Sequence, residues 1–549
     1  MMVDDWDGST SENSDVCVVG SGPVGLSLAT RLAAQGVRVL LFESGEKASN
    51  PLIQSLGNAE IDPAAHDDMA IVTSRQLGGT SNLWGARTLP FDPIDFEDRD
   101  WIGVRWPITY TEMASYLPDA VRATASGAPV YVESLGSDQV DRAFAAAEAG
   151  FRADVLERWA NEQRAQVIHR EAIRNDPRLV VCTGMTVTGL RFAENGLVEA
   201  VEVRGSKDGA PATVPVRQLV LAAGGIETTR LLLAAQRSAP ERFGGSDGPL
   251  GRYYQGHVVG EIAEIHFARP DFARAFDFRV DSHGSYVRRR IVASAETQRA
   301  ARLLNCAFWP VVPKIGHADH HSAILSMIYL IMKVGPVARL LVAEKIRQMN
   351  LTPDDSSVWA HLLNLLRGAP AAAVFGVEFL AKRFDRKTRL PGIFVRNSGG
   401  RYGLSYHSEQ LPNPDSRLTL TADTDRLDLP KLKIDLRFLS QDAELTLRQH
   451  VLLENWLREA GLAQLRYHLP EPERVASILS QARHGTHQIG TTRMGFSRRD
   501  GVVDRNCTTF DCPNLHLATT AVLPTSGQAN PTLTAVALAL RLADRLARR

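Results

Sequence analysis

The sequence lacks any excess of charge of one sign. Its 549 residues carry 62 basic and 62 acidic side chains. Such a balance gives no general attraction to nucleic acid or to acidic membranes. We therefore expect no nucleic-acid partner and look for function in local sites, on a chain long enough for two or more structural regions.

Cysteine is scarce as well, and none of it follows the spacing typical of a zinc site. The five residues are Cys17, Cys182, Cys306, Cys507 and Cys512. An odd, scattered set favours a reducing compartment over a secreted scaffold, so we predict a cytoplasmic protein without a structural metal. We interpret the one close pair, Cys507 and Cys512, as loop and core thiols.

A convincing export or membrane segment is also missing. Residues 1–14 are acidic and contain no apolar core of a signal peptide, so we predict a disordered leader there. The longest apolar stretch, residues 322–343, is interrupted by Lys333, Gly335, Pro336 and Arg339 before it reaches the ~20 apolar residues that span a bilayer. We expect no transmembrane segment; peripheral membrane attachment is the alternative for this stretch.

What the sequence does contain begins with a glycine-rich turn. Residues 15–19 predict a buried strand, 22–35 a helix and 37–42 a second strand. The turn reads GSGPVG, with Gly20 for the tight bend, Gly22 for approach of a pyrophosphate and Gly25 for close packing of helix on strand. Glu43 ends the second strand, where it could accept hydrogen bonds from a ribose. The pattern predicts dinucleotide binding but does not choose between FAD and NAD; the alternative is an ordinary glycine-rich turn.

The order of segments predicts an α/β Rossmann-type nucleotide-binding domain with an α+β second domain. We assign residues 15–250 to the first domain, including an irregular ligand-covering loop at about 57–107. Residues 251–440 would form the substrate domain, with a helical block at 320–383 that we interpret as a lid or subunit contact. Residues 441–549 would return to the first domain, ending in a strand at 515–519 and a helix at 531–548.

Two candidate catalytic residues lie near the C-terminus. Asn530 precedes Pro531, which suits the first helical position, so we expect Asn530 to be the N-cap of the last helix. His487 lies in a loop rich in Gly and Thr, and a neutral imidazole is a common base for an alcohol proton. Loop histidines are more often structural, so the residue pattern alone leaves the role of His487 open.

Several motifs together are similar to those of the glucose-methanol-choline (GMC) oxidoreductases. They are GSGPVG with Glu43, GGTSNLWGAR from residue 78, LAAGGIETTRLLL from 221, HQIGTTRMG from 487 and PTSGQANPTLTA from 524. The resemblance covers both ends of the chain and its middle connector. It implies an FAD-dependent alcohol oxidoreductase in which His487 deprotonates a hydroxyl, Asn530 orients it, and hydride passes to flavin N5.

The resemblance also implies a set of cofactor-binding residues. These are Gly20, Gly22, Pro23, Val24, Gly25, Glu43, Ser44, Gly78, Gly79, Thr80, Ser81, Asn82, Trp84, Val187, Ala223, Gly224, Thr520, Ala521, Pro531 and Thr532. Some pyranose oxidases tether FAD through a histidine immediately before the tryptophan of the GGTSNLW loop. Leu83 stands at that position, so we expect FAD to be bound non-covalently.

For the substrate, the motifs most resemble the pyranose-oxidase-like, sugar-oxidising branch. Residues 402–420 predict a strand that could place His407, Glu409 or Gln410 toward the flavin, although Glu409 and Gln410 could equally be a solvated strand end. A pocket carboxylate would favour an amino sugar, so we expect oxidation of a primary, 6'-type alcohol as in aminoglycoside antibiotic biosynthesis. Dioxygen or a small acceptor would reoxidise the flavin, and a homo-oligomer is a further expectation. A lyase of the same fold, oxidation of a non-sugar alcohol and an NAD-binding protein remain alternatives.

Overall fold

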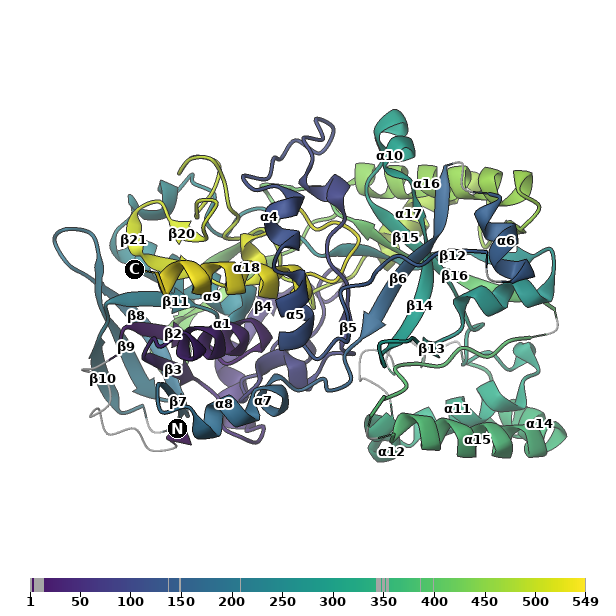
Figure 1. Cartoon of the computed structure of the whole chain (residues 1–549), viewed down its shortest axis with the longest axis horizontal. Coiled ribbons are helices and arrows are strands. Elements are labelled where there is room, and N and C mark those ends of the chain that lie inside the picture. The colour runs from purple at the N-terminus through teal and green to yellow at the C-terminus, as the bar shows by residue number, and fades with distance from the viewer. Residues whose placement is uncertain are drawn as a thin grey trace.

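Two large β-sheets lie side by side in the computed structural model of this chain (Figure 1). The structure describes residues 2–3, 14–136, 138–147, 150–207, 209–341, 347, 351, 355–385, 387–397 and 399–548. Residues 1 and 4–13 of the expected leader lie outside this part of the chain. Within the leader, β1 (Met2–Val3) pairs with the edge of the first sheet.

The first sheet is the predicted Rossmann-type sheet, and the α/β fold class is confirmed. Its order is β1, β7 (Leu179–Thr183), β3 (Val39–Glu43), β2 (Val16–Val19), β11 (Gln218–Leu221), β21 (Cys512–Leu517) and β20 (Thr508–Thr509). All pairs are parallel except the last. Every residue of β2 and β3 is buried, as expected for strands covered on both faces. Helices α1 (Pro23–Ala34) and α18 (Thr532–Leu546) pack on each other beside this sheet.

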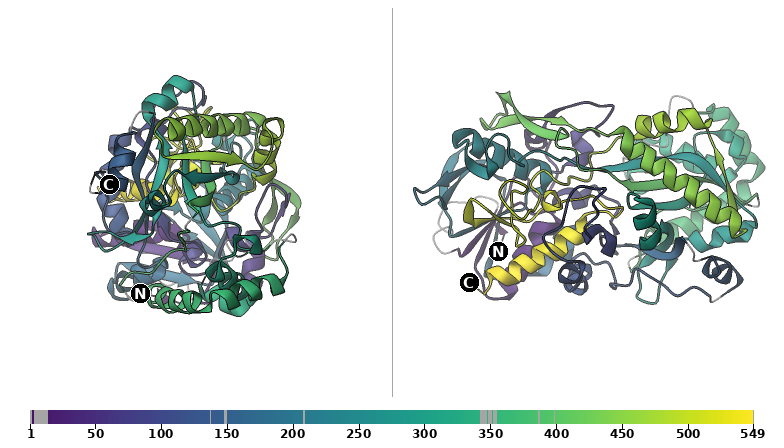
Figure 2. Two further views of the ribbon diagram at one scale, coloured as in Figure 1. Left: turned by 90° about the vertical axis from the view of Figure 1, so that its right-hand side faces the viewer. Right: turned by 90° about the horizontal axis from the view of Figure 1, so that it is seen from above.

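The second sheet is antiparallel and lies in the other half of the molecule (Figure 2). Its order is β19 (Ala463–Tyr467), β12 (His257–Phe267), β16 (Arg401–Glu409), β15 (Cys306–Val311), β14 (Tyr286–Ala293), β6 (Phe151–Trp159) and β5 (Arg87–Thr88), with β13 (Arg279–Val280) beside β14. Helices α16 (Ser440–Glu459) and α17 (Glu471–Gln481) pack against it. On β16, Tyr402, Leu404 and Tyr406 belong to the core shared with these helices. Because side chains alternate along a strand, His407 faces the opposite side, toward the Rossmann half.

The sheets divide the chain differently from the expected boundaries. Strands β5 and β6 fall within 15–250 yet pair in the second sheet. Helix α16, which begins one residue before the expected boundary at 441, and β19 and α17 after it also pack there. Strands β17 (Arg417–Thr424) and β18 (Pro430–Asp435) form a small sheet with β4 (Ala59–Ile61). Periodicity indicates that a segment is a strand but not which strand it pairs with. We propose to assign the two domains by sheet membership.

The helical block consists of α11 (Ala323–Lys333), α12 (Gly335–Leu341), α14 (Val358–Arg367) and α15 (Ala369–Arg383), at the lower right of Figure 1. Trp359 and Leu366 are 76% and 75% exposed, so α14 presents an apolar face to solvent. In the described part of the chain, no helix is by itself long and apolar enough to cross a membrane. Only α14 and α15 together would satisfy length and composition, and they meet at 93°.

The remaining elements connect these layers. A fourth sheet contains β10 (Pro211–Pro215), β9 (Val198–Gly205) and β8 (Met185–Phe192). The other helices are α2 (Pro51–Gln54), α3 (Met69–Val72), α4 (Tyr110–Ala114), α5 (Leu117–Ala123), α6 (Gln139–Ala145), α7 (Ala165–Ile168), α8 (Arg170–Asn175), α9 (Gly224–Ser238) and α10 (Ala295–Ala301). All five cysteines are buried as free thiols.

Candidate active site

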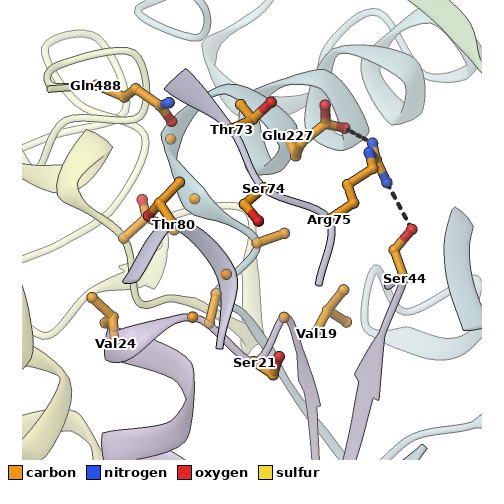
Figure 3. A pocket seen from close by; sticks show the side chains of 18 of the residues that line it. Val19, Ser21, Val24, Ser44, Thr73, Ser74, Arg75, Thr80, Glu227 and Gln488 are labelled. Atoms are coloured by element: carbon orange, nitrogen blue, oxygen red, sulfur yellow. Dashed lines mark hydrogen bonds and ion pairs between the residues drawn. The ribbon is translucent and has the colours of Figure 1, made fainter. Parts of the chain in front are cut away.

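An open cleft lies at the carboxyl ends of the Rossmann strands (Figure 3). The space within it, counted together with the open solvent at its mouth, is about 1350 Å³. Its walls come from the β2–α1 turn, the end of β3, residues 72–75, the start of α9 and the residues just before and at the start of α18. Segments that are hundreds of residues apart in sequence therefore contribute to one elongated site.

Three helix N-termini line this cleft, and in none of them does the N-cap residue cap its own helix, although at α9 the backbone N–H of Ile226 donates to Gln488 Oε1 at 3.1 Å. The helices α1, α9 and α18 begin after Gly22, Ala223 and Pro531, and no cap side chain accepts a hydrogen bond at any of the three. The first backbone N–H groups of a helix have no partner within it, and the helix dipole makes this end positive. The three starts together fit an anionic ligand such as a pyrophosphate.

Glu43 lies at the end of β3 on the cleft wall, as expected. Its carboxylate accepts hydrogen bonds from Ser21 N at 2.9 Å, Ser21 Oγ at 2.6 Å and Gly45 N at 2.7 Å. Burial raises the pKa of Glu43 above its ordinary value, although these hydrogen bonds oppose the shift. The carboxylate therefore holds the glycine turn in shape.

The structure places most of the expected cofactor residues on the cleft wall. They are Gly20, Gly22, Pro23, Val24, Glu43, Ser44, Gly79, Thr80, Trp84, Val187, Ala223, Gly224, Thr520, Pro531 and Thr532. Gly25, Gly78, Ser81, Asn82 and Ala521 lie behind this wall. An added Cβ at Gly25 would be 2.1 Å from Gly20 O, so Gly25 serves helix–strand packing. Ser81 and Asn82 bond the backbone of their own loop.

An ion pair on the cleft wall was missed from the sequence. Arg75 Nη2 lies 2.6 Å from Glu227 Oε2, and Arg75 Nη1 donates to Ser44 Oγ at 2.9 Å. A single arginine in an irregular loop gives no sequence signal, whereas Glu227 lies within the LAAGGIETTRLLL motif. The guanidinium places a fixed positive charge at the end of β3, where it could contact a ribose or phosphate.

His487 and Asn530 contact each other beside the cleft, and their neighbours in sequence line its wall. Asn530 Nδ2 lies 3.2 Å from His487 Nε2, and Arg87 Nε donates to Asn530 Oδ1 at 2.9 Å. Thr486 and Gln488 line the cleft on either side of His487, and Pro531 follows Asn530 on the same wall. The structure thus brings together two residues that are 43 positions apart.

The hydrogen bonds determine which nitrogen of His487 carries the proton. His257 Nε2 is 3.2 Å from the carbonyl oxygen of Ser526, and a carbonyl can only accept, so His257 carries its proton on Nε2. Its Nδ1 must then accept from His487 Nδ1 at 2.9 Å. His487 Nε2 is left with a lone pair, which accepts from the Asn530 amide. A proton acceptor therefore faces Asn530.

Four histidines surround this point: His257, His407, His484 and His487, whose ligand atoms lie within 4.8 Å of one another. Burial lowers the pKa of His257 to about 3 and that of His407 well below its ordinary value, and Arg87 and Arg290 add to both shifts. His407 Nδ1 donates to the carbonyl of Gln528 at 2.7 Å. The nearby arginines disfavour a divalent cation as they disfavour imidazolium, so we interpret the group as held by hydrogen bonds and not by a metal ion.

Asn530 does not cap the last helix, contrary to expectation. Helix α18 begins at Thr532, with Pro531 at the N-cap position. The Asn530 side chain instead bonds Arg87 and His487, which come from elsewhere in the chain. The local sequence favours a cap, but tertiary partners occupy both ends of the amide.

The structure does not support Glu409 and Gln410 as substrate-binding residues. Glu409 is fully buried and forms a two-point ion pair with Arg99, at 2.7 and 2.8 Å. Gln410 accepts from Gly256 N and donates to the Arg437 carbonyl. Both side chains join the second sheet to neighbouring loops, because a buried carboxylate requires a cation and hydrogen-bond donors.

Comparison with known families decides what this site belongs to. Residues 412–539 match the family model of the GMC oxidoreductases, and residues 13–58 match an FAD-binding domain. The chain is a GMC oxidoreductase. As in that family, FAD is the cofactor, and the uncapped helix starts and glycine turn described above fit its pyrophosphate. The enzyme oxidises a CH–OH group with FAD as the acceptor.

Relatives of this GMC oxidoreductase act on several alcohols. The chain is 22% identical to 2-methyl-1,2-propanediol dehydrogenase of Mycolicibacterium austroafricanum (98% of this chain, 96% of the relative) and 22% identical to the fructose dehydrogenase large subunit of Gluconobacter japonicus (97% of each). It is 34% identical to paromamine 6'-oxidase of Streptomyces fradiae over 131 residues, or 21% of this chain and 24% of that one. The fold resembles pyridoxine 4-oxidase from Mesorbium loti, with TM-score 0.53 and 18% identity over 97% of this chain and 99% of that one.

Proposed function

We propose that this GMC oxidoreductase oxidises a hydroxyl group of a sugar, with His487 as the base and Asn530 as the residue that orients the hydroxyl. The observation that carries the proposal is the position of His487, whose Nδ1 lies 2.9 Å from His257 Nδ1 and whose Nε2 lies 3.2 Å from the Asn530 amide nitrogen beside the cleft. When bound, FAD accepts the hydride from the carbon, and His487 takes the hydroxyl proton. General-base assistance of this kind contributes about 10²- to 10⁴-fold in rate.

The fixed orientation of His487 supports this role. His257 remains neutral because of its burial and accepts the Nδ1 proton, so the lone pair of the neutral His487 imidazole is on Nε2. Arg87 holds the Asn530 oxygen, which turns the amide nitrogen toward the imidazole. A substrate hydroxyl that replaces the direct bond between these two residues would donate to His487 Nε2 and accept from Asn530 Nδ2. We also propose non-covalent FAD, because Leu83 cannot form the histidyl link.

An amino-sugar substrate is the second candidate. Its support is the 34% identity with paromamine 6'-oxidase in one segment. The pairing of Glu409 with Arg99 removes the carboxylate that would have recognised an amine. A sugar without an amino group therefore remains the better-supported substrate.

Anaerobic reduction of the purified enzyme tests the proposal. D-Glucose, D-fructose, D-glucosamine, paromamine and 1,2-propanediol are mixed separately with the yellow enzyme, and loss of the flavin absorption band is followed. We expect a neutral sugar to reduce the flavin fastest. Reduction by the diol alone would contradict a sugar substrate, and a flavin that no alcohol reduces would favour a lyase.

A further inference from the structure

Three arginines surround one tryptophan on the face of the second sheet that looks toward the cleft. The guanidinium carbons of Arg87, Arg288 and Arg290 lie 5.2, 5.2 and 5.0 Å from the ring centre of Trp309. We name these three side chains the arginine face. Strand β14 reads YVRRRIVA, and alternation along the strand puts residues 288 and 290 on one side. Arg289 points to the other side, where it pairs with Glu133 and Asp141.

Positive charge on this face exceeds the negative charge that it meets. The three guanidinium groups share one carboxylate, Glu157, which lies 3.2 Å from Arg87 and 2.7 Å from Arg288 Nε. Asp92 also acts on Arg290 through charge, but its carboxylate accepts hydrogen bonds from Asn305 and Gln528. The surplus cation is therefore not neutralised within the described chain.

Arg290 is the least satisfied member. It is 0% exposed, and none of its three guanidinium nitrogens has a hydrogen-bond partner among the described residues. Its Nε is 3.8 Å from Glu157 Oε2, too far for a hydrogen bond. Burial lowers the pKa of Arg290 to about 9, so the group is still cationic at neutral pH. A buried cation with five unused donors is costly and requires an explanation.

The arginine face lies beside the reacting groups. Arg87 donates to Asn530, and the charges of Arg87 and Arg290 both lower the pKa values of His257 and His407. A second, small cavity lies next to it, lined in part by Ala86, Trp159, Arg383 and Arg389. Arg288 is 5.7 Å from the Trp159 ring centre, so this cavity adjoins the arginine face. Arginine side chains therefore continue from the arginine face to this second cavity, through Arg383 and Arg389.

We propose that the substrate carries an anionic group, a carboxylate or a phosphate, which Arg288 and Arg290 bind while its hydroxyl lies at His487. The inference rests on the proposed sugar oxidation and narrows it to acidic sugars such as a uronate or a sugar phosphate. A guanidinium matches both oxyanions with paired N–H donors. The same charges would repel a cationic amino sugar.

Anaerobic flavin reduction of the holoenzyme on matched scaffolds tests this. The first set is D-glucose, D-glucuronate, D-glucose 6-phosphate and D-glucosamine; the second is glycerol, glycerate and glycerol 3-phosphate. We expect the reduction rate constant divided by Kd to be about 10- to 100-fold higher for one anion than for its neutral parent, as expected from hydrogen bonds to a charged group. Which anion is preferred distinguishes carboxylate from phosphate. We expect glucosamine to fall below glucose.

Two neighbouring substitutions make the test specific. In Arg290→Met, the reduction rate constant divided by Kd should become nearly the same for an anion and for its neutral parent. Arg289→Met removes the same charge from the other side of the strand and should preserve the preference for the anion. Arg290→Met should also raise the melting temperature, because it removes an unpartnered buried cation, so its folding can be checked directly.

The outcomes separate the two proposals. If glucose is oxidised at the same rate as glucuronate and glucose 6-phosphate, sugar oxidation stands and the anion inference fails. A glycerate or glycerol 3-phosphate preference without sugar oxidation would contradict the sugar substrate and keep the anion site. The anion inference is overturned if neither scaffold shows a preference for an anion over its neutral parent. It is also overturned if none of the compounds reduces the flavin. It is also overturned by an Arg290→Met variant that slows all substrates equally.

Discussion

The glycine turn lies at one end of the proposed site, and the arginine face with the histidines around His487 lies at the other. The chain builds these two ends in opposite ways. The turn uses one contiguous segment, from β2 through α1 to Glu43 at the end of β3. The other end takes side chains from β5, β12, β14 and β16 and from two C-terminal loops. The proposed binding of the cofactor phosphates therefore depends on the geometry of one short segment. The proposed catalysis and substrate selectivity depend on how distant strands pair.

The largest expected effect compares two glycines of the turn. Gly22 has φ −63° and no protein atom within 4 Å of an added Cβ, so Gly22→Val should fold normally and crowd the pyrophosphate. At Gly25 an added Cβ would be 2.1 Å from Gly20 O, so Gly25→Val should cost more than the ~4–5 kcal/mol that single substitutions rarely exceed. FAD content and melting temperature are measured for both. A yellow Gly22→Val enzyme would contradict the proposed phosphate loop.

His487→Ala should leave the cofactor end intact and disable the other end. We expect full FAD content and flavin reduction slowed by about 10²- to 10⁴-fold, because the proton acceptor is lost. Stopped-flow reduction under anaerobic conditions measures it. His450→Gln is the control, since His450 is buried against Phe308 and Tyr406 and bonds only its own helix among the contacts described. Equal loss in both variants would remove His487 from the mechanism.

Glu409→Gln tests whether that carboxylate is structural. Breaking its buried pair with Arg99 should lower the free energy of unfolding by about 3–5 kcal/mol, because the arginine stays buried without its partner. The ratio of glucosamine to glucose oxidation should not change. Chemical denaturation and the two rates measure this. Arg99→Met combined with Glu409→Met should recover much of the stability. A changed ratio at normal stability would return Glu409 to the substrate site.

Acid should act on the half of the molecule that contains the second sheet more than on the glycine turn. Burial lowers the pKa of His257 to about 3 and of His450 to about 4, against about 6.5 in the unfolded chain. Both histidines are neutral in the folded and unfolded chain above pH 6.5. As pH falls below 6.5, only the unfolded chain takes up the protons, so the free energy of unfolding decreases. Each should cost about 2 kcal/mol by pH 5. Denaturation at pH 7 and pH 5 measures the loss, and His257→Phe should reduce it. An unchanged loss would contradict the assignment.

The smallest effect is expected at His257, which acts through His487. His257→Phe removes the acceptor of the Nδ1 proton, worth about 1 kcal/mol, so kcat should fall about fivefold with little change in KM. His257→Gln keeps a side-chain oxygen acceptor and should recover most of the rate. A similar loss in both variants would indicate packing alone, and a rise in KM with unchanged kcat would contradict the positioning role.

The sequence predicted the glycine turn residue by residue, because strand, turn and helix are adjacent and each glycine has one geometric reason. The C-terminal pair came only from the family resemblance. Asn530 was expected to cap α18 and instead bonds Arg87, a residue 443 positions away. Glu409 was expected in the pocket because a strand pattern does not say which face is covered. The arginine face was missed, although three consecutive arginines in an apolar strand are an unusual signal.

The three uncapped helix starts have a consequence for producing the enzyme. Without FAD, the positive ends of α1, α9 and α18 line the cleft with no phosphate to bind, and Glu43 and Glu227 are the carboxylates that line it with them. Filling the cleft would then act as the last step of maturation, drawing the walls together. We expect the yield of intact protein to follow the riboflavin supply of the host cell, with the unloaded form cleared by proteases.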